Sequence, residues 1–151
     1  MKHYDACLPE KKDWCVPAAL QTVLKSRGIQ INQKEIAPCF PRLSNGFEFN
    51  NGLLGKFLKK FNLGSEFYDP FSVPYGDEFN YKDIDRDLDS LMKEKERNLL
   101  TAYKKISGDH LAVVSRFKEG LIYMVGVEEG MPLSKLLESM ASNRYGFYAI
   151  N

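Results

Sequence analysis

The sequence lacks a charge surplus and long apolar runs, and each absence excludes a class of partner. Its 21 Lys and Arg residues nearly cancel its 20 Asp and Glu residues, which leaves a net charge of +1. Because binding to nucleic acid draws on a surplus of basic side chains, no nucleic-acid partner is expected. No stretch approaches the roughly 18 apolar residues that cross a bilayer, so no membrane partner is expected.

Signals for export and for metal binding are also lacking. The stretch from Met1 to Cys15 has no apolar core of a secretory signal, so the chain as given is expected to be cytoplasmic. Its cysteines, Cys7, Cys15 and Cys39, are odd in number, which argues against a disulfide framework. Their spacing matches no zinc motif. A zinc site built from these thiols and His110 is therefore not expected, and no cofactor is implied.

What is present is the composition of an ordinary folded protein. The chain has 151 residues, of which 44% are hydrophobic and 27% are charged. This length supports one core without disulfide or metal support. We find no internal repeat and no flexible linker, so residues 1–151 are expected to form a single domain. The oligomeric state stays open.

The first part of the chain has the apolar spacing of helices. Helices are expected from Val16 to a stop at Gly28, from Asn32 to just before Pro38, from Asn51 to Asn62, and from Tyr81 to Arg97. The aromatic and proline-rich stretch before Tyr81 fits neither a helix nor a strand. This loop, from Tyr68 to Tyr81, is where we expect residues that line a substrate cleft.

The last third of the chain changes to short apolar runs. Strands are expected from Leu99 to Tyr103, from Leu111 to Phe117, from Leu121 to Val127 and from Phe147 to Ile150, with a helix from Pro132 to Ser142. Helices followed by antiparallel strands predict an α+β domain.

Cys15 stands where the first long helix is expected to begin. Unpaired backbone N–H groups and the positive end of the helix dipole favour a thiolate at that position and lower the thiol pKa. The same N–H groups stabilise an oxyanion formed by attack of the sulfur on a carbonyl. A cysteine used only as a small buried hydrophobic residue is the other interpretation, and position alone does not separate the two. Neighbouring Trp14 either lines the cleft or anchors the helix start.

A nucleophilic thiol needs a base, and the chain has two histidines to offer. His3 lies near the N-terminus. His110 begins an expected strand, where the sheet holds it while its ring reaches a cleft at the sheet edge. The alternative is a solvated histidine at a strand end. A cysteine opening an early helix and a histidine opening a later strand have the order of papain-like enzymes.

These segments together resemble a known family. The matching parts are Cys15 to Leu20, Leu24 to Ile29, Gln33 to Ala37, Gly108 to Val114 and Gly120 to Val125. The chain resembles the compact papain-like cysteine peptidases of the bacteriocin leader-processing, double-glycine branch. The resemblance implies N-terminal helices carrying the Cys, packed on a C-terminal antiparallel sheet carrying the His. It further implies that Cys15 is the nucleophile and His110 its general base.

The sequence departs from that family at two positions. The family usually has a Gln about six residues before the Cys, which completes the oxyanion hole, and this chain has Pro9 followed by Glu10. The family strand after the His strand normally ends in Asp-Pro, with the Asp orienting the imidazole. Here Gly126 and Val127 stand in its place, and Glu128 follows as the candidate for that role. Glu128 as an ordinary turn residue is the alternative, in which case Asp109 or a backbone carbonyl orients the ring.

The sequence therefore predicts a cysteine hydrolase, a peptidase or amidase, that acts on a peptide or amide substrate through Cys15, His110 and Glu128. A papain-like acyltransferase uses the same parts. The two departures favour a different class, a papain-like domain without turnover that serves as a binding or regulatory module. A plain interaction domain in which Cys15 and His110 never meet is the weakest alternative.

Overall fold

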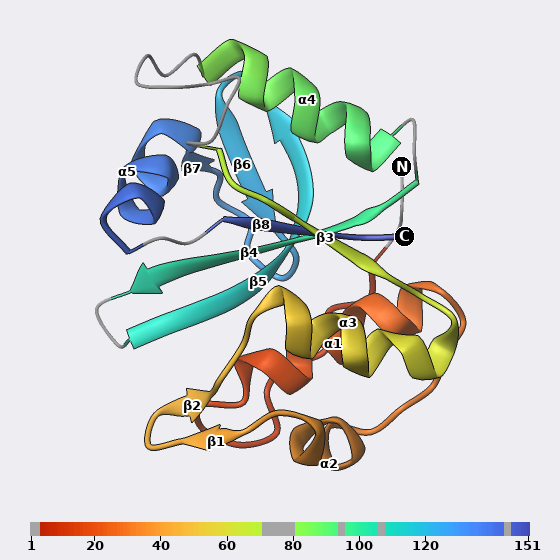
Figure 1. The fold of residues 1–151 in the computed structure, drawn as a ribbon. Helices are drawn as coiled ribbons and strands as arrows, with labels where there is room; N and C mark the ends of the chain where they lie inside the picture. The colour runs from red at the N-terminus through yellow and green to blue at the C-terminus, as the bar shows by residue number, and fades with distance from the viewer. Residues whose placement is uncertain (1–3, 71–80, 94–95, 106–107, 144–145) are drawn as a thin grey trace.

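An antiparallel sheet crosses the middle of the molecule and separates two groups of helices (Figure 1). The computed structural model describes residues 4–70, 81–93, 96–105, 108–143 and 146–151. Over these residues the main sheet has six strands in the order β3-β8-β4-β5-β6-β7. The strands are β3 (Ser65–Tyr68), β4 (Asn98–Lys105), β5 (Gly108–Lys118), β6 (Leu121–Met124), β7 (Met131–Pro132) and β8 (Phe147–Ile150).

The helices lie on both faces of this sheet. On one side are α1 (Cys15–Ser26), α2 (Gln33–Ile36) and α3 (Asn51–Leu58), with a small hairpin of β1 (Arg42–Leu43) and β2 (Gly46–Phe47) (Figure 1). On the other side are α4 (Tyr81–Lys93) and α5 (Leu133–Asn143). The predicted α+β fold, with N-terminal helices packed on a C-terminal antiparallel sheet, is confirmed.

Each face of the sheet has its own apolar core. Side chains that alternate along a strand point to opposite faces, so β4 and β5 supply both cores. On the α1 side, Leu100 and Val113 join the buried stripes of α1 and α3. On the other side, Leu99 and Val114 pack with α4 and α5. Burial of this apolar area on both faces is the main stabilising contribution to the fold.

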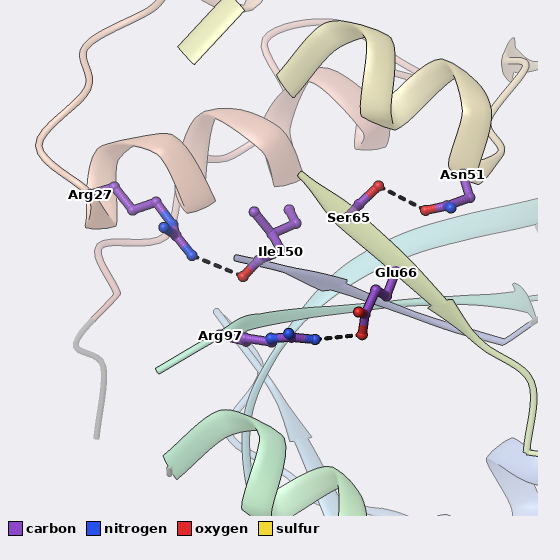
Figure 2. Close-up of polar contacts among 6 residues, drawn as sticks. All are labelled: Arg27, Asn51, Ser65, Glu66, Arg97 and Ile150. Atoms are coloured by element: carbon purple, nitrogen blue, oxygen red, sulfur yellow. Dashed lines mark hydrogen bonds and ion pairs between the residues drawn. The ribbon is translucent and has the colours of Figure 1, made fainter. Parts of the chain in front are cut away.

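Polar contacts fasten the first helices to the sheet (Figure 2). The Arg27 guanidinium, just after α1, donates to the Ile150 carbonyl at 2.9 Å and to the Asn98 side-chain oxygen at 2.6 Å. The Ser65 hydroxyl on β3 donates to the side-chain oxygen of Asn51 at the start of α3, at 2.7 Å. Arg97 and Glu66 form an ion pair at 2.6 Å. The Arg27 contacts thus fasten the end of α1 to β8 and β4, the Ser65 bond fastens α3 to β3, and the ion pair links β3 to the start of β4.

Several predicted bounds are corrected. The predicted helix from Asn51 to Asn62 becomes α3 plus a 3₁₀ turn, Lys59–Phe61, and Asn62 ends it with a φ of +57°. The predicted helix from Tyr81 to Arg97 ends earlier, at Lys93 in α4, and Asn98 already begins β4. The predicted strand from Leu121 to Val127 ends at Met124, because Gly126 turns the chain with a φ of +83°. The strands β1, β2, β3 and β7 were not predicted.

Candidate active site

Cys15 is the first residue of α1 and is half-buried. The chain turns into the helix at Asp13, which has a φ of +64°, a conformation that Asp tolerates better than most residues. The first helical bond runs from the Ala18 N–H to the Trp14 carbonyl at 3.1 Å. Pro17 has no N–H to satisfy. The N–H groups of Cys15 and Val16 therefore stand at the open end of the helix, next to the thiol.

The thiol also meets the edge of β5. The backbone N–H of Leu111 is within hydrogen-bonding reach of the Cys15 sulfur. The pairing of Val113 explains why the Leu111 N–H has no strand partner on this side. The Val113 carbonyl points toward β6, where it accepts from the Val125 N–H at 2.8 Å. Backbone groups two residues apart on a strand point the same way, so Leu111 also faces the β6 side. There β6 has already ended at Met124, and Cys15 occupies the edge that it leaves.

The surroundings of Cys15 raise its pKa, whereas the sequence predicted a lowered one. Burial is the largest cause, because it disfavours the charged thiolate. The N–H groups of Leu111, Val16 and Cys15 oppose it, and the nearby Asp13 carboxylate raises the pKa further. The helix N-terminus acts in the predicted direction, but burial outweighs it. A thiolate at this site therefore needs a base to take the proton.

Cys15 and His110 line the same two pockets. The first, here the N-terminal pocket, has a volume of about 200 Å³ and lies between residues 6–9, α1, the start of β5 and residues 125–127. The second, here the hairpin pocket, has a volume of about 270 Å³ and lies between Cys15, the β1–β2 hairpin, Asp109 and Tyr148. Both predicted residues thus line both pockets.

The two pockets differ in the side chains that line them. Along α1, the N-terminal pocket follows Cys15, Ala18, Ala19 and Thr22, which share one face of the helix. Their small size leaves the pocket open. The hairpin pocket is larger and includes aromatic rings, among them Phe47 of the hairpin. The two pockets next to the sulfur therefore differ: the N-terminal pocket is smaller and has small side chains along α1, whereas the hairpin pocket is larger and is lined in part by aromatic rings.

His110 is half-buried near the start of β5 and packs against Tyr103 of β4. The two residues are directly opposite each other in the antiparallel pairing. Their ring centroids are 5.4 Å apart, and their planes meet at 77° in an edge-to-face arrangement. Burial raises the pKa of the Tyr103 hydroxyl, and the negative charge of a Cys15 thiolate raises it further. No sequence signal pointed to Tyr103, because its register with His110 depends on the folded sheet.

The structure does not bring Glu128 to either pocket. Glu128 follows the turn after β6, is exposed, and lines neither pocket. Asp109 is also exposed and lines the hairpin pocket. Pro9 lines the N-terminal pocket, whereas Glu10 does not. Among the residues described, the assignment of the carboxylate that orients His110 stays a prediction.

Of the two roles that the sequence left open for Trp14, the structure favours the anchor over the cleft wall. Trp14 lines neither pocket. Its ring meets Phe47 edge-on, with centroids 6.2 Å apart, and Lys11 lies 5.0 Å from its centre. Trp14 therefore anchors the helix start to the hairpin, and Phe47 is the ring that reaches the hairpin pocket.

The N-terminal segment is held against the site by buried polar side chains. The Gln33 amide group donates to the Leu8 carbonyl at 2.8 Å, and its oxygen accepts from the Glu10 N–H at 3.0 Å. The Cys7 N–H donates to the Thr22 hydroxyl at 3.0 Å. Gln33 is only 1% exposed. One wall of the N-terminal pocket thus depends on contacts made from α1 and α2.

Other features of the described residues bear on function only indirectly. Cys7, Cys15 and Cys39 are free thiols. Within the ranges described, no group of three or more His, Cys, Asp or Glu residues is arranged to hold a metal ion. No described helix combines the length and the apolar character needed to cross a membrane. Residues 71–80, most of the loop in which we expected cleft-lining side chains, lie outside the described residues.

Two solved structures share this architecture over nearly the whole chain. The peptidase domain of Streptococcus ComA, a bi-functional ABC transporter involved in a quorum sensing pathway, has a TM-score of 0.63 at 14% identity, covering 99% of this chain and 97% of that one. The fold is that of a papain-like peptidase domain. A double glycine motif protease from an AMS/PCAT transporter, solved with its leader peptide, has a TM-score of 0.60 at 12% identity, covering 99% and 90%.

The resemblance to the double-glycine branch is thereby confirmed at the level of the fold. No protein-family model and no curated protein matches the chain. The papain-like peptidase fold explains why a helix N-terminus and a sheet edge meet at Cys15. It does not by itself assign an activity, because one fold supports many functions.

Proposed function

We propose that this chain is a cysteine hydrolase that cleaves a peptide or amide bond, with Cys15 as nucleophile and His110 as general base. One observation carries the proposal: both residues line the same two pockets, at the open end of α1. A pocket on each side of the sulfur leaves room for the substrate on both sides of the bond that is cut.

The reaction would proceed through an acyl-enzyme. His110 takes the Cys15 proton as the sulfur attacks the substrate carbonyl carbon. The carbonyl oxygen becomes an oxyanion, which the Cys15 and Val16 N–H groups can stabilise at the helix end. His110 then returns the proton to the leaving amine, and the C–N bond breaks. Water, activated by His110, attacks the thioester and releases the acid, which regenerates the thiol.

The raised pKa of Cys15 decides how the first step would run. A preformed thiolate is disfavoured by burial, so proton transfer to His110 has to accompany the attack. The Leu111 N–H supports the developing negative charge on sulfur. The site therefore suits general-base catalysis by His110 better than a preformed thiolate–imidazolium pair.

A peptide is the substrate class that the comparisons favour. One of the similar structures is a peptidase domain and the other is a protease bound to a leader peptide. From these comparisons we propose only that the substrate of this chain is a peptide. Amide hydrolysis on another scaffold and acyl transfer to an amine would use the same Cys15 and His110 chemistry.

The test is the rate at which iodoacetamide alkylates Cys15 as a function of pH, read by peptide-resolved mass spectrometry. Peptide resolution separates Cys15 from Cys7 and Cys39. His110→Ala is expected to slow alkylation at neutral pH by about tenfold or more and to leave the rate at high pH unchanged. Equal rates at neutral pH would refute the Cys15–His110 pair. His3→Ala is the matched control and should change nothing.

A second candidate is a papain-like module that binds a peptide without cutting it. It is favoured by the raised Cys15 pKa, by the exposed position of Glu128, and by Pro9 at the place of the usual oxyanion-hole Gln. Incubation with a degenerate peptide library separates the two candidates. New peptide ends that disappear in Cys15→Ala indicate hydrolysis, whereas peptide retention without cleavage in both proteins indicates a binding module.

A further inference from the structure

We propose that Tyr103 is the residue that holds the His110 imidazole in its working orientation toward Cys15. This inference rests on the proposed function, since it concerns the base of the same site. The sequence analysis expected a carboxylate to orient His110, and we assign that positioning role to the buried Tyr103 ring of β4.

The pairing of the strands fixes where the two rings stand. Tyr103 and His110 are register partners in the β4–β5 pairing. Directly opposite residues on antiparallel strands project to the same face with their Cβ atoms close together. The contact between their side chains is therefore built into the sheet and does not depend on a flexible loop.

The ring geometry is one that constrains an imidazole. The χ2 torsion of a histidine is broad and has no sharp minimum of its own, so a neighbour has to select the plane of the ring. The Tyr103 ring stands edge-to-face to it at 77° with a centroid separation of 5.4 Å. That separation lies within the favourable range for aromatic pairs. A rotation of the imidazole out of this plane would lose the contact.

Tyr103 itself has little freedom to move. It is 5% exposed and belongs to the core on the α4 and α5 side of the sheet. The same core includes Leu99 on its own strand and Ala112 on β5. A ring fixed by close packing is a rigid wall for its neighbour. His110 packs against this wall and lines both pockets together with Cys15.

The charge state of Tyr103 agrees with this role. Burial and the neighbouring Cys15 charge both raise the pKa of its hydroxyl, so the ring is a neutral phenol at neutral pH. Tyr103 therefore acts on His110 through its aromatic ring and adds no negative charge near the Cys15 sulfur.

The experiment compares Tyr103→Phe, which keeps the ring, with Tyr103→Met, which fills much of the space without one. Alkylation of Cys15 by iodoacetamide is measured at about pH 7, where the base is needed, and at about pH 10, where it matters less. At neutral pH, Tyr103→Phe is expected to stay within about twofold of the parent and Tyr103→Met to fall about three- to tenfold. At high pH all three rates are expected to agree.

The double variant decides whether Tyr103 works through His110. In a His110→Ala background, Tyr103→Met is expected to cause no further loss at neutral pH. An equal loss in that background would show a merely structural role and overturn the inference. An unchanged rate in Tyr103→Met, or a fall in Tyr103→Phe as large as in Tyr103→Met, would overturn it as well.

Two safeguards keep the test decisive. If Tyr103→Met does not fold by circular dichroism, the intact protein is used instead: the His110 ring protons should show NOEs to the Tyr103 ring over the whole titration. Loss of these NOEs in either protonation state would overturn the inference. If His110→Ala leaves neutral alkylation unchanged, the proposed function fails; if His110→Ala slows it and Tyr103→Met does not, only the role of Tyr103 fails.

Discussion

Gln33→Leu is predicted to release the N-terminal segment while leaving the rest of the fold in place. Gln33 is buried in α2, and its side chain bonds the Leu8 carbonyl, the Glu10 N–H and the Gln21 side-chain oxygen. Leucine occupies a similar volume but makes none of these bonds. Since Leu8 and Glu10 are exposed, water can solvate their backbone groups once they are free. The loss should therefore appear as local opening.

The size of the effect follows from the two bonds that hold the segment. Each hydrogen bond contributes about 1 kcal/mol net, so losing the bonds to Leu8 and Glu10 costs about 2 kcal/mol. That value corresponds to a roughly thirtyfold larger population of the open segment. The Cys7 N–H to Thr22 bond remains and limits the opening to the part around residues 8–12. The melting temperature should fall by only a few degrees.

Limited trypsin digestion measures this opening, because Lys11 and Lys12 are exposed and lie in the segment. Cleavage there should be about thirtyfold faster in Gln33→Leu than in the parent protein, provided that opening is fast relative to cleavage. Gln30→Leu is the matched control, since Gln30 is exposed and far less constrained. Unchanged cleavage in Gln33→Leu, or acceleration spread evenly over the whole chain, would refute the reasoning.

Three further predictions follow from charge and burial at the site. Asp13→Asn should lower the Cys15 pKa and raise alkylation near pH 8 by up to about threefold, since Asp13 opposes the thiolate; Asp5→Asn should not. Glu128→Gln should slow neutral alkylation less than about threefold, because the carboxylate is exposed; a larger loss would make it the residue that orients His110. The folded state raises the pKa of Cys15 and Tyr148, so thermal stability should fall as pH rises past the ordinary pKa values of Cys and Tyr; Tyr148→Phe should reduce that fall above about pH 10.

The local hydrophobic pattern of the sequence predicted those elements in which every residue is buried. The strand from Phe147 to Ile150 was predicted with its observed bounds, because β8 is buried on both faces and reads as a continuous apolar run. The edge strand β3 was missed, since its burial does not alternate: Glu66 and Phe67 are exposed between the partly buried Ser65 and Tyr68, and β3 pairs with β8 alone. Its strand character comes from a partner far away in the chain, which a local pattern does not contain.

The end of β6 shows a second limit of the sequence. Val125 and Val127 continue the apolar run, so a strand to Val127 was predicted, yet Val127 is 51% exposed. The strand ends before Val127 because the backbone turns at Gly126. This early end is what opens the Leu111 amide to Cys15, so an error of three residues in a strand hid a central feature of the site.

The places of Cys15 and His110 in the fold were predictable, whereas their environment was not. Cys15 at a helix start and His110 at a strand start followed from local spacing, and the structure places both on the same pockets. The pKa of Cys15 was predicted in the wrong direction, because the degree of burial depends on packing between distant segments. The contact of Tyr103 with His110 depends on strand register, which no local pattern specifies.

The position of β8 inside the sheet has a consequence for how the protein is made. β8 separates β3 from β4 and contributes Tyr148 and Ile150 to the core under α1 and α3. While the chain emerges from the ribosome, β3 has no partner until about eighty residues later. The apolar faces of the first helices stay uncovered during that interval, which invites aggregation or chaperone binding. Folding is therefore expected to wait until β8 has left the ribosome, and a fragment that stops before Phe147 should aggregate instead of forming a smaller domain.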